Sequence, residues 1–132
     1  MEFFETVITN NAKKRVMDCL NSGRLSEGKL VAEFEKKLEE VFGYKNGVAV
    51  NSGTSALHLA LVLCGVGWGD EVIIPIPAYG TFIEQVKLAQ GKPVLAKLQP
   101  PFKLKAEDIE KNLSQKTKII LLNSPSNPTG AM

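Results

Sequence analysis

Residues 69–98 read GDEVIIPIPAYGTFIEQVKLAQGKPVLAKL, and this stretch decides the fold class of the 132-residue chain. The continuous apolar run in residues 71–75 is typical of a strand that is covered on both faces, and a proline ends it. Residues 79–90 can form a helix, which a Gly-Lys-Pro sequence separates from a second apolar run in residues 94–98. This order of strand, helix and strand predicts two parallel strands joined by a crossover helix.

The same alternation continues on both sides of that unit. Before it, the pattern predicts an amphipathic helix, a short strand and a helix that is apolar nearly all round; after it, a short helix and a fourth strand. These elements cover residues 30–42, 48–51, 55–64, 106–113 and 118–123. No linker or internal repeat divides the chain, so we predict an α/β fold with one parallel sheet covered by helices on both faces.

Composition and charge exclude several classes of function. The chain has 44% hydrophobic and 23% charged residues, which is typical of one soluble domain. Its formal net charge of +2, with lysines interspersed among glutamates, is too small for a nucleic-acid-binding surface. The N-terminus has no basic and apolar leader, and no apolar run approaches the roughly 18 residues of a membrane span. We therefore expect neither secretion nor membrane insertion.

The cysteines and the single histidine do not suggest a metal site. Cys19 and Cys64 are far apart in the sequence, and His58 has no cysteine or carboxylate at metal-ligand spacing. We expect both cysteines to be free, buried thiols in a reducing, cytoplasmic setting. His58 lies within the apolar helix, where we expect a core histidine whose hydrogen bonds are satisfied.

Three segments follow predicted strands and carry residues that can bind a ligand, since ligands of open α/β sheets bind at the carboxyl ends of the strands. Residues 51–55, Asn-Ser-Gly-Thr-Ser, combine a glycine turn with hydroxyl groups at a helix N-terminus. Free N–H groups and the helix dipole make such a segment suitable for phosphate. The same residues are equally typical of an ordinary helix cap.

The other two segments supply an aromatic ring and an amide. Tyr79 follows the strand at residues 71–75 and is able to stack on a flat ligand, although such a ring more often packs its helix against the sheet. Asn127 follows the fourth strand on a loop stiffened by Pro125 and Pro128, where its amide can donate to a ligand or cap its own turn. Because a parallel sheet brings all three segments to one edge, together they predict a site for a phosphorylated aromatic cofactor.

Longer motifs resemble a known group of enzymes. The stretches SGRLSEGKLVAEFEKKLEEVFG, NSGTSALHLAL and GDEVIIP resemble the sugar aminotransferases of the DegT/DnrJ/EryC1/StrS family. The later stretches PIPAYGTF, FKLKAEDIEKNL and IILLNSPSNPTG are more similar to the class I/II amino-acid aminotransferases. Both groups are fold-type I enzymes that depend on pyridoxal 5'-phosphate (PLP).

This resemblance implies a three-layer αβα large domain with a PLP site. By resemblance, Ser52, Gly53, Thr54 and Ser55 would hold the cofactor phosphate, Tyr79 would stack on the pyridine ring, and Asn127 would hydrogen-bond the phenolic oxygen. The resemblance also divides the chain into an N-terminal arm, residues 1–28, and a partial PLP-binding domain, residues 29–132.

The family pattern needs two catalytic residues that no position of this chain matches: the aspartate that pairs with the pyridinium nitrogen and the Schiff-base lysine. Both follow the Asn-Pro-Thr-Gly loop, so the resemblance implies that they lie beyond Met132 and that the isolated chain is inactive. It further implies a small-molecule amino donor, a keto acid or keto-sugar as acceptor, and a homodimer or association with a missing C-terminal half.

The leading alternative is a non-catalytic module that binds PLP or another anion, or that serves in assembly. A nicotinamide-binding domain is disfavoured, because no G-x-G-x-x-G sequence follows the first predicted strand.

Overall fold

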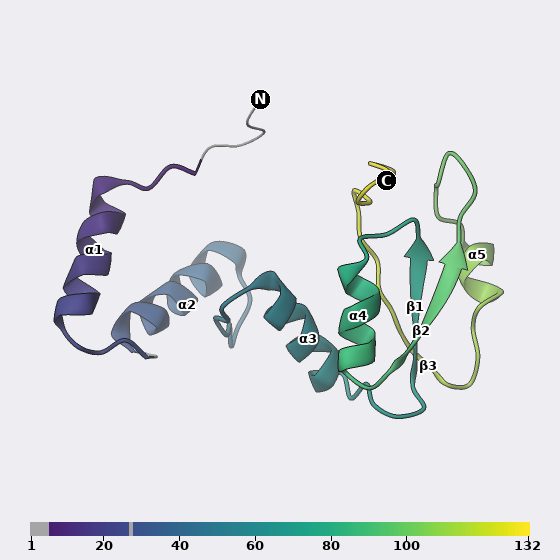
Figure 1. Ribbon diagram of the computed structural model, residues 1–132, viewed down its shortest axis with the longest axis horizontal. Coiled ribbons are helices and arrows are strands. Elements are labelled where there is room, and N and C mark those ends of the chain that lie inside the picture. The colour runs from purple at the N-terminus through teal and green to yellow at the C-terminus, as the bar shows by residue number, and fades with distance from the viewer. Residues whose placement is uncertain (1–5, 27) are drawn as a thin grey trace. The chain divides into compact units, whose positions relative to one another are not determined.

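A computed structural model describes residues 6–26 and 28–132 of the chain. It contains two compact units, one that ends at Ala49 and one that begins at Val50 (Figure 1). The first unit holds helices α1 (Asn10–Asn21) and α2 (Lys29–Phe42). The α2 helix confirms the amphipathic helix predicted for residues 30–42, and it ends at Gly43 with a left-handed φ of 72°. The α1 helix was not predicted from the sequence.

The strand predicted at residues 48–51 is wrong, because these residues form no strand. Carboxylates of α2 take up the backbone donors of this segment: Ala49 N–H donates to Glu35 Oε1 at 2.7 Å, and Gly47 N–H to Glu39 Oε1 at 2.8 Å. Residues 47–49 are therefore tied to a helix rather than to a neighbouring strand. A short apolar run cannot reveal this, since strand formation depends on a partner that the run does not specify.

The second unit is the α/β part of the chain. Its elements are α3 (Gly53–Leu63), β1 (Glu71–Ile76), α4 (Thr81–Leu88), β2 (Lys92–Lys97), α5 (Ala106–Glu110) and β3 (Thr117–Ile120). The strands pair in parallel in the order β2-β1-β3. The connection from β1 through α4 leads outward to β2. The connection from β2 through α5 returns past β1 to β3. Because both connections are right-handed, α4 and α5 lie on opposite faces of the sheet (Figure 1). The predicted parallel three-layer arrangement is confirmed.

The central strand β1 carries the core. Val72, Ile73 and Ile74 are fully buried, as is Val86 of α4. Ile73 lies opposite Val94 of β2 and Ile120 of β3, which fixes the register of all three strands. Alternate residues of β1 point to opposite faces, so a continuous apolar run is required where both faces are covered.

The α3 helix differs from its prediction. It was expected to be buried nearly all round, yet Leu61 is its only fully buried residue. The cause is that α3 packs against α4, so only one of its faces meets the core. The prediction of buried thiols also fails: Cys64, at the end of α3, is exposed and Cys19 is half-buried, although both are free.

Charged residues tie the amino ends of the strands together. The Glu71 carboxylate accepts from Lys92 Nζ at 2.8 Å and from Ser114 Oγ at 2.7 Å. The hydrogen bonds from Lys92 and then from Ser114 hold the pKa of Glu71 below its usual value. Nearby, Lys118 Nζ donates to Gly65 O at 2.6 Å and to Asp70 Oδ2 at 3.2 Å. Among the helices described, none combines the length and the apolar character needed to cross a bilayer.

Candidate functional site

The first turn of α3 holds the predicted phosphate-binding residues. Ser52 is the N-cap, and its Oγ accepts from the backbone N–H of Ser55 at 3.1 Å. The two serine hydroxyls lie 3.0 Å apart, and Ser55 Oγ donates to Asn51 Oδ1 at 2.6 Å. Residues 51, 52 and 55 are thus brought together by their side chains, and the helix cap weighed as an alternative is present.

Two backbone donors remain available beside this cap. Across residues 6–26 and 28–132, the N–H groups of Gly53 and Thr54 donate to no acceptor of the chain. Gly53 and Thr54 are both exposed, and a Cβ added at Gly53 would meet no atom within 4 Å. Free N–H groups at the positive end of an 11-residue helix favour an anion. Capping and anion binding therefore use different donors and are compatible.

Tyr79 leaves the carboxyl end of β1 and precedes α4. Its ring packs edge-on against Phe82, with ring centroids 5.9 Å apart and an interplanar angle of 80°. The side chain is nevertheless 53% exposed, so it does not serve only to pack the helix against the sheet. An exposed ring held by an aromatic neighbour can stack on a flat ligand.

Asn127 lies in the turn that follows β3. It is exposed, and its side-chain amide makes no hydrogen bond to any described residue. The turn is held instead by backbone bonds from Gly130 N–H to Ser126 O at 2.6 Å and from Ser126 N–H to Ala131 O at 2.8 Å. The Asn127 amide is therefore not used to cap its own turn and is free to meet a ligand.

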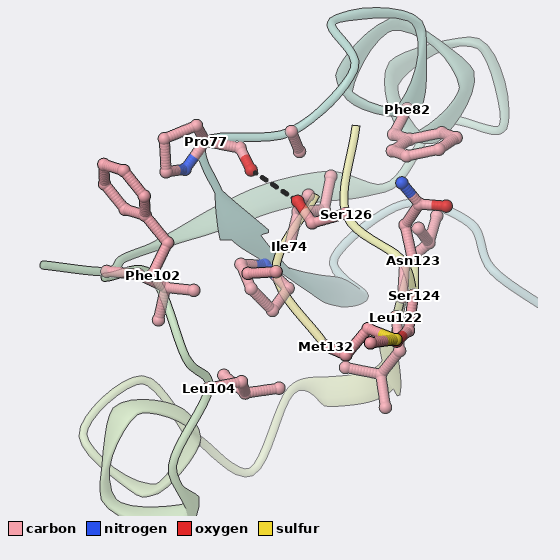
Figure 2. A pocket seen from close by; sticks show the side chains of 15 residues that line it. Ile74, Pro77, Phe82, Phe102, Leu104, Leu122, Asn123, Ser124, Ser126 and Met132 are labelled. Atoms are coloured by element: carbon pink, nitrogen blue, oxygen red, sulfur yellow. Dashed lines mark hydrogen bonds between the residues drawn. The ribbon is translucent and has the colours of Figure 1, made fainter. Parts of the chain in front are cut away.

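A cavity of about 170 Å³ lies at the carboxyl edge of the sheet (Figure 2). Residues that leave all three strands line it: Pro77 after β1, Phe102 after β2 and Asn123 after β3, with Phe82 from α4. At this edge, Ser126 Oγ donates to Pro77 O at 3.4 Å and so joins the segment after β3 to the segment after β1. Because most of the lining is apolar and none of it is charged, the cavity suits an apolar group rather than acid–base chemistry.

The structure brings only part of the predicted site together. Tyr79 and Asn127 follow parallel strands and so share the carboxyl edge, as predicted. Residues 52–55 follow no strand, so the sheet does not place them at that edge, and none of the six predicted residues lines the cavity. The cavity residues were missed because no ligand-binding role was given to Phe82, Phe102 or Ser126, although they lie in the stretches PIPAYGTF, FKLKAEDIEKNL and IILLNSPSNPTG.

His58 does not match its prediction as a satisfied core histidine. Its Nδ1 atom is buried yet has no hydrogen-bond partner among the described residues, and the residue as a whole is only half-buried. The error arises because an apolar helix sequence shows where a histidine lies but not what faces it.

Comparisons with known proteins show the family of the chain. A family model for the DegT/DnrJ/EryC1/StrS aminotransferases matches residues 6–124. GDP-perosamine synthase of Caulobacter vibrioides is 37% identical over 116 residues, covering 86% of the chain and 31% of that protein. An aspartate aminotransferase of Rhizobium meliloti is 33% identical, covering 92% of the chain and 32% of that protein. Both resemblances inferred from the sequence are therefore reflected in these relatives.

Solved structures give the same result. A sugar aminotransferase from Streptococcus pneumoniae in its PLP-form matches with a TM-score of 0.83 and 31% identity, covering 91% of the chain and 31% of that protein. The aspartate aminotransferase structure from Rhizobium meliloti matches with a TM-score of 0.74 and 31% identity, covering 96% of the chain and 34% of that protein. The chain thus spans about a third of the length of these relatives, and it belongs to the DegT/DnrJ/EryC1/StrS aminotransferase family.

Proposed function

We propose that this chain forms the phosphate-binding and ring-binding part of a PLP-dependent aminotransferase. The observation that carries the proposal is the pair of N–H groups at Gly53 and Thr54, which lie on exposed residues at a helix N-terminus and donate to no described acceptor. The aminotransferase relatives, one of them solved in a PLP-form, support the choice of PLP over another phosphorylated ligand.

The individual residues have the chemistry that such a cofactor needs, although the sheet does not place residues 52–55 at the edge that Tyr79 and Asn127 share. Gly53 and Thr54 donate to the phosphate, while Ser52 and Ser55 hold the turn in shape and present their hydroxyls beside it. Tyr79 offers an exposed ring face to the pyridine, and the unpaired Asn127 amide donates to the phenolic oxygen. When bound, PLP supplies an electron sink for amino transfer.

We assign the covalent lysine of the reaction to none of the lysines of this chain. Lys92 and Lys118 are paired with Glu71 and Asp70 at the amino ends of the strands, the edge opposite Tyr79 and Asn127. We propose that the Schiff-base lysine and the pyridinium-pairing aspartate come from further sequence of the same protein or from a partner chain. The 132 residues alone are then inactive.

The substrates follow from the two kinds of relative. A small-molecule amino donor and a keto acid or keto-sugar acceptor agree with the names of the aspartate aminotransferase and GDP-perosamine synthase relatives. We propose that the protein works in the cytoplasm as a homodimer, or in association with a C-terminal half. The competing candidate is a non-catalytic anion-binding or assembly module, which the same free N–H groups would also serve.

The two candidates differ in whether they recognise the ring. Pyridoxamine 5'-phosphate is the suitable probe, because it has no aldehyde and cannot modify surface lysines. We expect it to bind more tightly than inorganic phosphate, and Tyr79→Leu should reduce this preference about fivefold, equivalent to roughly 1 kcal/mol of stacking. Calorimetric titration of the parent chain and the variant measures both affinities. Equal affinity for the two ligands would favour the anion-binding module.

A second measurement tests the lysine assignment. After incubation with PLP and reduction with borohydride, mass spectrometry should find only scattered, substoichiometric adducts. A stoichiometric adduct on a single lysine of this chain would overturn the assignment.

A further inference from the structure

Two buried polar atoms of the second unit are left without partners. Across the described residues, buried side-chain nitrogen and oxygen atoms that lack a hydrogen bond are limited to His58 Nδ1 and Gln85 Oε1. Gln85 is 4% exposed, and its Oε1 is buried. An unpaired buried polar group is costly, and native proteins pair more than nine in ten such groups, so these two atoms call for an explanation.

The positions of the two residues point to the same helix contact. His58 lies three residues before Leu61 on α3, and Gln85 lies four residues before Ala89 on α4. Residues three or four apart share one face of a helix. Leu61 and Ala89 both belong to the core cluster in which α3 packs against α4. Both unpaired atoms are therefore on the faces that the two helices turn toward this core.

The chemistry of the two atoms is complementary. An amide oxygen can only accept a hydrogen bond, whereas a neutral imidazole carries its proton on either Nδ1 or Nε2. We propose that His58 and Gln85 form a hydrogen-bonded link across the α3–α4 contact through one buried water molecule, which accepts from His58 Nδ1–H and donates to Gln85 Oε1. The link satisfies both buried atoms at once and makes His58 a positioning residue.

The link connects the two parts of the ligand site, a consequence that rests on the proposed function. The α3 helix begins with the phosphate-binding residues 52–55, and α4 begins just after Tyr79. Fixing α3 on α4 therefore fixes the distance between the phosphate donors and the stacking ring. Inorganic phosphate contacts the phosphate donors but not the stacking ring, so loss of the link should not change its affinity.

The tautomer of His58 is the direct test. Nitrogen-15 NMR of the chain labelled at histidine reports one imidazole, because His58 is the only histidine. We expect the Nδ1–H form, and we expect Gln85→Met to shift the population toward Nε2–H, while Gln115→Met at an exposed glutamine leaves it unchanged. A His58 that carries its proton on Nε2, or one that does not respond to Gln85→Met, would overturn the proposal. Neither result depends on whether the chain binds PLP.

Variants provide an independent test. His58→Asn keeps an N–H donor close to the position of Nδ1, whereas His58→Phe removes it. In urea unfolding, His58→Phe and Gln85→Met should each raise the unfolding equilibrium constant about fivefold or more. In the double variant, the increase in this constant should be much smaller than the product of the two single increases. His58→Asn should recover most of the loss. Independent effects in the double variant, or no recovery with asparagine, would contradict the link.

The link should affect the binding of pyridoxamine 5'-phosphate but not the binding of inorganic phosphate. Gln85→Met should weaken pyridoxamine 5'-phosphate binding about threefold or more and leave inorganic phosphate unchanged. If neither ligand binds the parent chain, the proposed function fails while the tautomer test still stands.

Discussion

Gly53 is the residue at which folding and binding can be separated. It has no left-handed φ and no atom within 4 Å of an added Cβ, so the fold does not require glycine there. A bulky side chain would, however, occupy the space from which an anion reaches the N–H groups. We predict that Gly53→Leu abolishes measurable phosphate binding and stabilises the fold by up to about 1 kcal/mol, because glycine is a poor helix former.

Isothermal titration and urea unfolding measure the two effects of this change. The matched control is Gly80→Leu, since Gly80 also begins a helix, is exposed and has no atom near an added Cβ. That variant should bind phosphate as the parent does. Retained binding in Gly53→Leu would show that the anion does not approach past this residue.

The ends of the strands are held by the Glu71 interactions with Lys92 and Ser114, which join β1 to β2 and to the turn before β3. These bonds lower the pKa of Glu71 in the folded chain. The stabilisation is therefore present above the unfolded pKa, about 4.3, and is lost as the pH falls through the lower folded value. We predict that Glu71→Gln destabilises the fold at pH 7 and that the difference from the parent shrinks in acid.

Urea unfolding at pH 7 and at progressively lower pH measures this difference. Glu110→Gln is the control, because Glu110 is exposed and makes no side-chain hydrogen bond to a described residue. It should have almost no effect at either pH. A constant penalty for Glu71→Gln across the whole range would mean that the carboxylate charge is not what matters.

At the scale of elements, the sequence was most informative where local and long-range requirements agree. The run at residues 71–75 is both a good strand and a segment covered on both faces, and the structure places it at the centre of the sheet. The run at residues 48–51 has the same local character, but α2 carboxylates take the N–H groups of Ala49 within it and of Gly47 just before it. Whether this run forms a strand therefore depends on its tertiary contacts, which the sequence pattern does not reveal.

In the candidate site, too, local features could be predicted from the sequence and long-range ones could not. The cap formed by Ser52 and Ser55 was predictable because it uses bonds between residues three apart. The cavity that Phe82, Phe102 and Ser126 line was not, because it is assembled from segments that only the tertiary fold brings together. The unpaired Nδ1 of His58 escaped prediction for the same reason.

The whole molecule presents much apolar surface. Trp68 is 87% exposed, Phe42 68% and Leu122 63%, and many other large apolar side chains are open to solvent. Exposed apolar side chains on this scale can bring copies of a chain together. We predict that the isolated chain self-associates, with sedimentation velocity showing dimers or larger species as the concentration rises. A clean monomer at high concentration would contradict this expectation.

We predict that the N-terminus of α3 binds anions without further protein. Its donors are backbone groups of Gly53 and Thr54, and its shape is held by bonds within residues 51–55. Without a covalent tether, the affinity should be weak, with a dissociation constant of roughly 0.1 to 1 mM. Titration of the labelled chain with inorganic phosphate, followed by amide chemical shifts, is the most direct measurement. The largest saturable shifts should fall at Gly53 and Thr54, and saturable shifts centred away from residues 52–55 would show that the anion binds elsewhere.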